Sequence, residues 1–146
     1  MKKSKILAVG LLTVAALSLF TGCNNVSYKD GVYEGKSSVH DSEDGGGAGY
    51  GVVTITISGG EITDCVYLTY EPDGTLKDEN YGKQDGEVAN ADFYNKAQRA
   101  VMASTKYGEQ LKATKNVKEV DAITGATISY NEFEEAVADA LEQAKE

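Results

Sequence analysis

Residues 52–70, VVTITISGGEITDCVYLTY, contain the strongest secondary-structure pattern in the chain. In residues 52–58, β-branched side chains alternate along the segment, which is typical of a strand that buries one face. Gly59-Gly60 follows, and a glycine pair permits the tight turn of a hairpin. The regularly spaced apolar side chains of the second segment are Ile62, Val66, Leu68 and Tyr70. This stretch therefore predicts two antiparallel strands joined by a tight turn.

The residues on either side of the hairpin predict one further strand and a first helix. Residues 31–37, GVYEGKS, predict a strand, Pro72-Asp73-Gly74 predicts a turn, and residues 75–91 predict a polar loop. Asp92 can cap a helix that runs to about residue 113. The apolar and small residues at helical spacing in this segment are Phe93, Ala97, Ala100, Val101, Ser104, Gly108 and Leu111.

The C-terminal segment predicts a second amphipathic helix after a connector or short strand at residues 114–121. Ser129 and Glu132 fit a capping box, in which each side chain accepts a hydrogen bond from a backbone N–H at the helix start. The apolar face of this helix comprises Phe133, Val137, Ala140, Leu141 and Ala144. The order of elements predicts an α+β fold, with a small antiparallel sheet covered by two amphipathic helices.

Composition excludes several classes of protein. The chain has 146 residues, which suits one domain, and its net charge of −9 would repel a nucleic-acid backbone. Two cysteines and one histidine cannot form a Cys₄ or Cys₂His₂ zinc site or a disulfide framework. The acidic, glycine-rich residues 40–51 lack the bidentate Glu of an EF-hand, so we expect a solvated loop and no metal site. We expect Cys65, which lies in a strand segment, to be a packed structural cysteine.

The N-terminus has the pattern of a secretory signal peptide. Three lysines within residues 1–5 precede an uncharged, mostly apolar run over residues 6–20. Residues 19–23, LFTGC, resemble a bacterial lipobox, although Phe20 stands where leucine is usual. The resemblance implies that residues 1–22 are removed and that Cys23 is lipidated. A permanent anchor helix is the alternative interpretation.

Lipidation would explain how so acidic a protein stays at a membrane. Removal of residues 1–22 leaves 11 basic and 23 acidic residues, a net charge of −12. An anionic bilayer repels such a body, so acyl chains rather than charge would anchor it. We expect residues 23–30 to form a lipidated tether and residues 31–146 to form the functional domain.

Residues 121–127, DAITGAT, place two hydroxyl groups and several small residues just before the last predicted helix. An ordinary helix-entry loop has a similar composition. The segment also resembles the flavinylation motif of the FMN-binding domain family, which reads Asp, two variable residues, Ser or Thr, Gly, Ala, Thr. That family includes flavin-carrying subunits of the sodium-translocating NADH:quinone reductase and of the Rnf complex, and lipoproteins of extracellular electron transfer. The resemblance covers roughly residues 30–144, including DGVYEG at 30–35 and YNKAQ at 94–98.

The resemblance implies that Thr127 carries FMN through a phosphoester bond made by an ApbE-type flavin transferase. The other matching motif positions are Asp121, Thr124, Gly125 and Ala126. We expect Gly125 and Ala126 to leave room for the transferase and the ribityl chain. We expect Asp121 to serve in recognition or in bracing the loop. The phosphate would lie just before the start of a helix, where backbone N–H groups favour an anion.

The implied function is that of an electron carrier, lipid-anchored on the outer face of the cytoplasmic membrane. Electrons would arrive from a membrane quinol or NADH dehydrogenase and leave to an extracellular acceptor or reductase. No catalytic acid–base pair is evident, because the single histidine, His40, lies in the acidic loop, so a stand-alone enzyme is not expected.

An aromatic side chain is expected beside the flavin ring. Tyr81 is our choice for this contact, with Tyr94, Tyr107 and Tyr130 as alternatives. The alternative function is a lipoprotein of the same fold that binds a ligand or partner without flavin, with the acidic loop as part of its surface.

Overall fold

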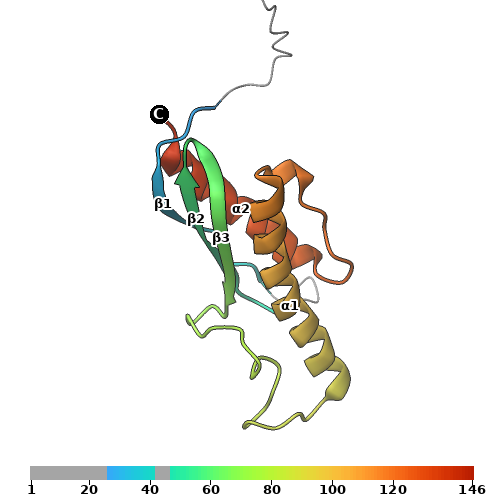
Figure 1. The fold of residues 1–146 in the computed structure, drawn as a ribbon. Helices are drawn as coiled ribbons and strands as arrows, with labels where there is room; N and C mark the ends of the chain where they lie inside the picture. Colours follow the sequence, from blue (N-terminus) through green and yellow to red (C-terminus); the bar gives the residue numbers. More distant parts are fainter. Residues whose placement is uncertain (1–25, 42–46) are drawn as a thin grey trace, which may run out of the picture.

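The computed structural model describes residues 26–41 and 47–146. The expected signal peptide, Cys23 and residues 42–46 of the acidic loop lie outside the described residues. The elements follow the order β1 (Gly31–Lys36), β2 (Tyr50–Ser58), β3 (Glu61–Tyr70), α1 (Ala91–Thr114), a 3₁₀ turn (Val117–Glu119) and α2 (Thr127–Ala144). Figure 1 shows the sheet on one side and the helices on the other. The predicted α+β fold is therefore confirmed.

The sheet is an antiparallel meander with the strand order β1-β2-β3. The turn between β2 and β3 has Gly59 and Gly60 at φ values of 64° and 76°. Two consecutive positive φ angles define a type I′ turn, whose twist matches that of a hairpin. The Asp30 carboxylate accepts a hydrogen bond from the backbone N–H of Gly60 at 3.0 Å. The predicted hairpin is thus present, and a residue preceding β1 supports its turn.

The second strand of the hairpin buries a different set of side chains from the one that its apolar spacing suggests. A β-bulge lies where Ile57 pairs with Ile62 but Thr56 pairs with Asp64, which leaves one extra residue in β3. That extra residue reverses the side-chain phase for the rest of the strand. Cys65 and Tyr67 are therefore buried, whereas Val66 and Leu68 are 49% and 41% exposed.

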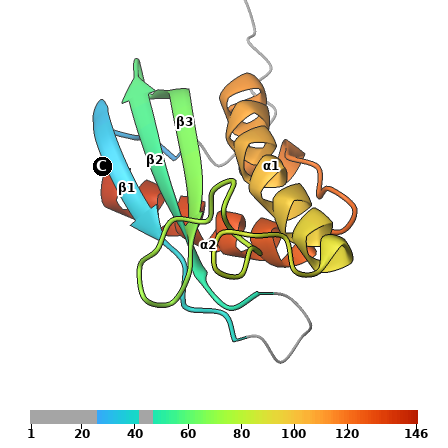
Figure 2. The ribbon, with the colours of Figure 1, turned by 90° about the horizontal axis from the view of Figure 1, so that it is seen from below.

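Both helices cover the inner face of the sheet. Helix α1 packs on β3, whereas α2 packs on β1 and β2 (Figure 2). The largest fully buried side chains come from β2 and both helices: Val53, Ile55, Ile57, Tyr107, Leu111, Phe133 and Val137. Cys65 joins this core, in agreement with the packed cysteine expected, and burial raises the pKa of its thiol to about 12.

The helix starts differ from those predicted. Helix α1 is capped by Asn90, whose side chain accepts a hydrogen bond from the backbone N–H of Phe93 at 3.0 Å, so Asp92 lies in the first turn. Helix α2 begins at Thr127, two residues before the predicted capping box. Ser129 is therefore the third residue of α2 rather than its cap, and both Ser129 and Glu132 are buried inside the fold.

The inner faces of the helices also differ in part from the predicted ones. Phe93 is 51% exposed, whereas Ala103 and Tyr107, which were not assigned to the face, are buried. Neither helix in residues 26–41 and 47–146 is both long and apolar enough to cross a lipid bilayer.

Part of the expected tether is paired with the end of the chain. The backbone N–H of Lys29 donates to the carbonyl of Ala144 at 2.8 Å, and that of Glu146 donates to the carbonyl of Ser27 at 3.3 Å. Residues 27–29 therefore lie against the C-terminal end of α2 instead of forming a free linker, because these backbone groups find partners there.

Gly35 in β1 allows α2 to approach the sheet closely. A Cβ atom at this position would lie 2.0 Å from the carbonyl oxygen of Ala136 and 2.8 Å from the Cβ of Ala140. Backbone atoms of a packed helix cannot move aside as a side chain can. The lack of a side chain at position 35 therefore sets the spacing of the two layers.

We expect Gly35→Ala to lower the free energy of unfolding by about 2–3 kcal/mol, or to prevent folding, because it overpacks this contact. Gly31→Ala in the same strand is the control, since its Cβ would meet only the movable ring of Tyr33 at 3.1 Å. Urea unfolding of both variants measures the difference. Equal stability of the two variants would contradict the proposed packing constraint.

Candidate functional site

The loop at residues 121–127 is held from α1 by a buried hydroxyl and a side-chain amide. Tyr107 is fully buried, and its hydroxyl accepts from the backbone N–H of Ile123 at 3.0 Å while donating to the carbonyl of Ala126 at 3.1 Å. The Gln110 amide accepts from the N–H of Asp121 at 2.8 Å and donates to its carbonyl at 3.3 Å. The loop is therefore fixed at both ends by side chains of one helix.

A tight turn within this loop explains its glycine. The backbone N–H of Ala126 donates to the carbonyl of Ile123 at 3.0 Å, and Gly125 has a φ of 81°. A positive φ at the third position of such a turn is the type II arrangement, which favours glycine. A Cβ atom on Gly125 would have no atom within 4 Å beyond those of its chain neighbours. Glycine is therefore favoured here by its backbone conformation, and the space around it is open.

Ala126 is buried at the base of this loop. Its side chain belongs to the hydrophobic core, so its small size satisfies packing inside the fold. It also precedes the first residue of α2 and supplies no side-chain cap to that helix.

Thr127 is exposed and is the first residue of α2. No side chain caps this helix, so its first backbone N–H groups have no capping side-chain acceptor. Such groups, together with the helix dipole, favour an anion close to the hydroxyl of Thr127. The predicted acceptor residue thus lies within the first turn of the helix.

A pocket of about 290 Å³ opens beside Thr127. Its walls come from the N-terminal half of α1, the loop between β3 and α1, the 121–127 loop and α2. Its apolar wall is formed on α1 by Phe93, Ala97, Ala100 and Val101. The polar lining includes Lys77, Tyr81, Lys96, Thr127 and Glu132.

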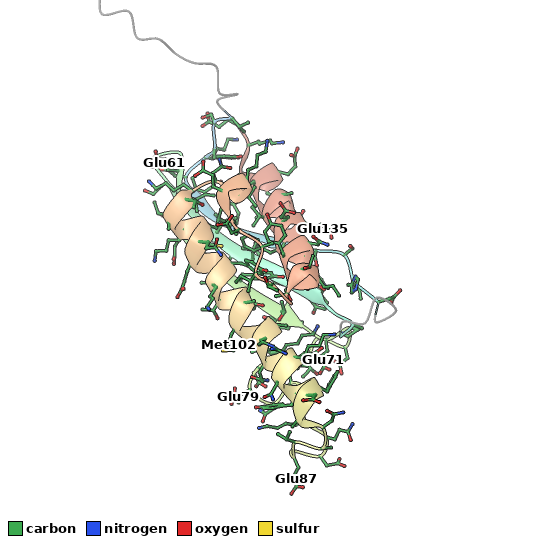
Figure 3. The ribbon with its side chains drawn as sticks, turned by 90° about the vertical axis from the view of Figure 1, so that its right-hand side faces the viewer. Glu61, Glu71, Glu79, Glu87, Met102 and Glu135 are labelled. Atoms are coloured by element: carbon green, nitrogen blue, oxygen red, sulfur yellow. The ribbon has the colours of Figure 1, made fainter. Side chains whose placement is uncertain are left out.

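The loop between β3 and α1 is tied to the helix beside it. The Gln98 amide donates to the carbonyls of Asp78 and Tyr81, both at 2.9 Å, and the Tyr94 hydroxyl donates to the carbonyl of Glu79 at 3.0 Å. In Figure 3, Glu71, Glu79 and Glu87 mark this loop beside the N-terminal half of α1. These contacts bring Lys77 and Tyr81 to the pocket.

Lys77 is a buried cation in the pocket wall. Its ammonium group donates to the carbonyl of Gly47 at 3.3 Å and lies 4.9 Å from the centroid of the Tyr81 ring. Burial lowers the pKa of Lys77, while the negative charges of Glu132 and Glu71 oppose that shift. The cation is thus held by a carbonyl and an aromatic face.

Glu132 is a buried acid in the same wall. It is 5% exposed, and its Oε1 atom has no hydrogen-bond partner among the described residues. Burial raises the pKa of its carboxyl, and the charges of Lys77 and His40 partly offset the rise. An unpartnered buried oxygen is costly, so this atom is positioned to accept a hydrogen bond from an occupant of the pocket.

Only part of this site could be identified from the sequence. Of the motif residues, Gly125, Ala126 and Thr127 line the pocket; Asp121 and Thr124 are exposed and do not. Among the tyrosines named as ring contacts, Tyr81 lines the pocket. Lys77 and Glu132 were missed as site residues. The available signal for Glu132 was its helical spacing with Ala136 and Ala140, which places it on the inner face of α2.

The chain matches the FMN-binding domain family over residues 46–142 and belongs to that family. Among solved structures, the CPE2226 protein from Clostridium perfringens is similar, with a TM-score of 0.57 and 22% identity, over 80% of this chain and 88% of that one. At this identity the similarity shows the fold alone. No significant match was found among curated proteins.

Family membership makes this chain a flavin-binding protein with FMN as its cofactor. The residues around the pocket fit such a group. Thr127 offers a hydroxyl beside free helix N–H groups, α1 offers an apolar wall, and Lys77 and Glu132 offer a donor and an acceptor for a polar ring edge.

We expect Glu132→Gln to stabilise the unloaded protein increasingly as pH rises from 4 to 8. Because the folded-state pKa is raised, the Glu132 carboxyl favours folding at low pH and loses that contribution as the pH rises through the folded pKa. The gain should be about 1.4 kcal/mol for each unit of the pKa rise. Urea unfolding across this pH range measures it.

Glu109→Gln is the control, because Glu109 is exposed on α1. It should leave the pH dependence of the free energy of unfolding unchanged. A pH-independent difference between Glu132→Gln and the parent chain would show that the Glu132 carboxyl does not change its proton affinity on folding.

Proposed function

We propose that this protein is a membrane-anchored electron carrier whose FMN is attached covalently to Thr127 through a phosphoester bond. The observation that carries the proposal is the exposed Thr127 hydroxyl at the uncapped start of α2, at the edge of the pocket. Membership of the FMN-binding domain family supports FMN as the group attached there.

The phosphate end of the cofactor finds complementary charge at this position. A phosphodiester keeps one negative charge, and the first N–H groups of α2 favour an anion. Lys77 and Lys96 also line the pocket, so two cations lie near the proposed attachment point in an otherwise acidic protein. This local charge distribution supports attachment at Thr127.

The ring end of the cofactor suits the rest of the pocket. Phe93, Ala97 and Val101 offer apolar contact, and Tyr81 offers an aromatic face. The flavin would supply the redox chemistry, while the chain supplies binding, orientation and electrostatics.

Attachment requires a flavin transferase of the ApbE type, which must reach the acceptor hydroxyl. Thr124, Gly125 and Thr127 are exposed, and Asp121 presents an exposed side chain from a backbone that Gln110 holds. These features support recognition of a preformed loop by the transferase, with Asp121 as a recognition group.

The resemblance of residues 19–23 to a lipobox supports placement on the outer face of the cytoplasmic membrane, with Cys23 as the lipidated residue. The electron donor would then be a membrane quinol or NADH dehydrogenase system. The acceptor would be an extracellular compound or a neighbouring reductase. Covalent attachment suits this location, because dissociated FMN would be lost from the cell.

We expect Thr127→Ala to abolish flavin fluorescence of the denatured protein in a gel, because the variant has no hydroxyl at the attachment point. The protein is co-expressed with and without an ApbE-type transferase. The control is Thr105→Ala, which removes an exposed hydroxyl from α1.

A fluorescent band should appear only with the transferase and only in the parent and control proteins. A fluorescent Thr127→Ala band would place the bond elsewhere. A dark parent band, with an active transferase shown on another substrate, would favour a lipoprotein that binds a ligand or partner without flavin.

We expect Cys23→Ala to move the protein from the membrane fraction to the soluble fraction, because it removes the thioether site for the acyl chains. Cys65→Ala is the control, since Cys65 is buried in the core and should leave membrane association unchanged. Detergent phase partitioning of both variants measures the change. Unchanged partitioning of Cys23→Ala would argue for a permanent anchor helix.

A further inference from the structure

Glu132 lies between the pocket beside Thr127 and a second hollow of about 360 Å³. The second hollow is open to solvent and is lined by residues of the segment after β1 and by the outer side of α2, including His40, Asp41 and Glu135. Glu132 and Ile128 line both cavities. The Glu132 side chain therefore forms part of the wall that separates them.

The charged groups around Glu132 come from every element packed against it. On the pocket side they are Lys77 of the β3–α1 loop and Lys96 of α1; on the hollow side they are His40, Asp41 and Glu135. The Tyr67 hydroxyl of β3 lies beneath, where burial and the charge of Glu132 raise its pKa. No direct ion pair joins Glu132 to Lys77 within the described residues, so the proton on Glu132 responds to the net local charge.

We propose that Glu132 takes up a proton when negative charge is placed in the pocket beside Thr127, and that it exchanges this proton with solvent through the second hollow. The inference rests on the proposed function, in which electrons enter an FMN group held in that pocket. A buried carboxylate next to added negative charge binds a proton more tightly, because like charges repel strongly where water is excluded.

Proton uptake by Glu132 accompanies the electron transfer. An external chemical reductant is oxidised by two electrons, which would reduce the FMN group held in the pocket, and one proton from the buffered solvent binds the Glu132 carboxylate to give the neutral acid. Only an O–H bond forms on the protein, and no protein group is oxidised. When the electrons leave, the proton returns to solvent. Glu132 thus compensates part of the charge that reduction introduces.

The test is the midpoint potential of the covalently loaded protein, measured from pH 5 to pH 9 by optical titration with a chemical reductant. Proton uptake on reduction makes the potential fall as pH rises, and Glu132 adds to that slope. The curves of the parent protein and Glu132→Gln should coincide at low pH, where Glu132 is protonated in both redox states. They should separate as pH rises, with the parent protein lower.

Glu135→Gln is the matched control, since it removes an exposed charge three residues further along α2 from the same hollow. Its curve should keep the steeper slope of the parent protein. A reduced-minus-oxidised infrared spectrum of the parent protein, taken at the pH where the potential curves diverge, gives an independent measurement. It should show a protonated carboxyl band that is missing from the spectrum of the flavin-loaded fraction of Glu132→Gln.

The outcomes separate the two proposals. Flavin that loads normally, with parallel potential curves and no carboxyl band, overturns the role of Glu132 and leaves the proposed function intact. Failure of the parent protein to load any flavin overturns both. Separation of the curves in Glu132→Gln but not in Glu135→Gln establishes the proton coupling.

Discussion

The hydroxyl of Tyr107 is the interaction on which the site depends. It uses its donor on the carbonyl of Ala126 and accepts from the N–H of Ile123, both inside the core. Loss of either hydrogen bond would leave a buried polar group unpaired and lower the free energy of unfolding. The two hydrogen bonds therefore favour one conformation of the loop between the helices. That conformation of the loop fixes the turn at Gly125 and the position at which α2 begins. The position of Thr127 therefore follows from the packing of α1.

The sheet and the two helices beneath the site are packed so closely that the distance between the two layers is fixed. Gly35 lets α2 approach β1 closely. Gly108 does the same for α1 and β3, because a Cβ atom at position 108 would lie 3.0 Å from the carbonyl oxygen of Cys65. The bulge in β3 turns Tyr67 inward, where its hydroxyl donates to the carbonyl of Ser129 at 2.9 Å. Strand and helix thus both support the first turns of α2. Rigid support of a loop by packed elements is what the proposed attachment of FMN at Thr127 by another enzyme would require.

The strand pattern, the glycine turn and the helical segments could be predicted because they depend on local spacing. The bulge could not, because one extra residue in β3 changes the buried set without changing the apolar content of the strand. The start of α2 was misplaced because Ser129 and Glu132 satisfy a capping pattern that the fold does not use. The motif at residues 121–127 contributes one edge of the pocket, so the sequence could indicate that edge. Lys77 and Glu132 escaped prediction because tertiary contacts, through a long loop and the inner face of a helix, bring them there.

Helix α2 would also determine how the molecule stands relative to the proposed lipid anchor. Residues 27–29 are paired with its C-terminal end, while Thr127 and the pocket lie at its N-terminal end. An 18-residue helix is about 27 Å long. With lipid at Cys23, the anchor and the flavin would be at opposite ends of this rod. A partner confined to the bilayer interior would lie beyond direct reach of the flavin, so a membrane donor would need a domain that projects outward, whereas partners in the surrounding medium would approach the pocket freely.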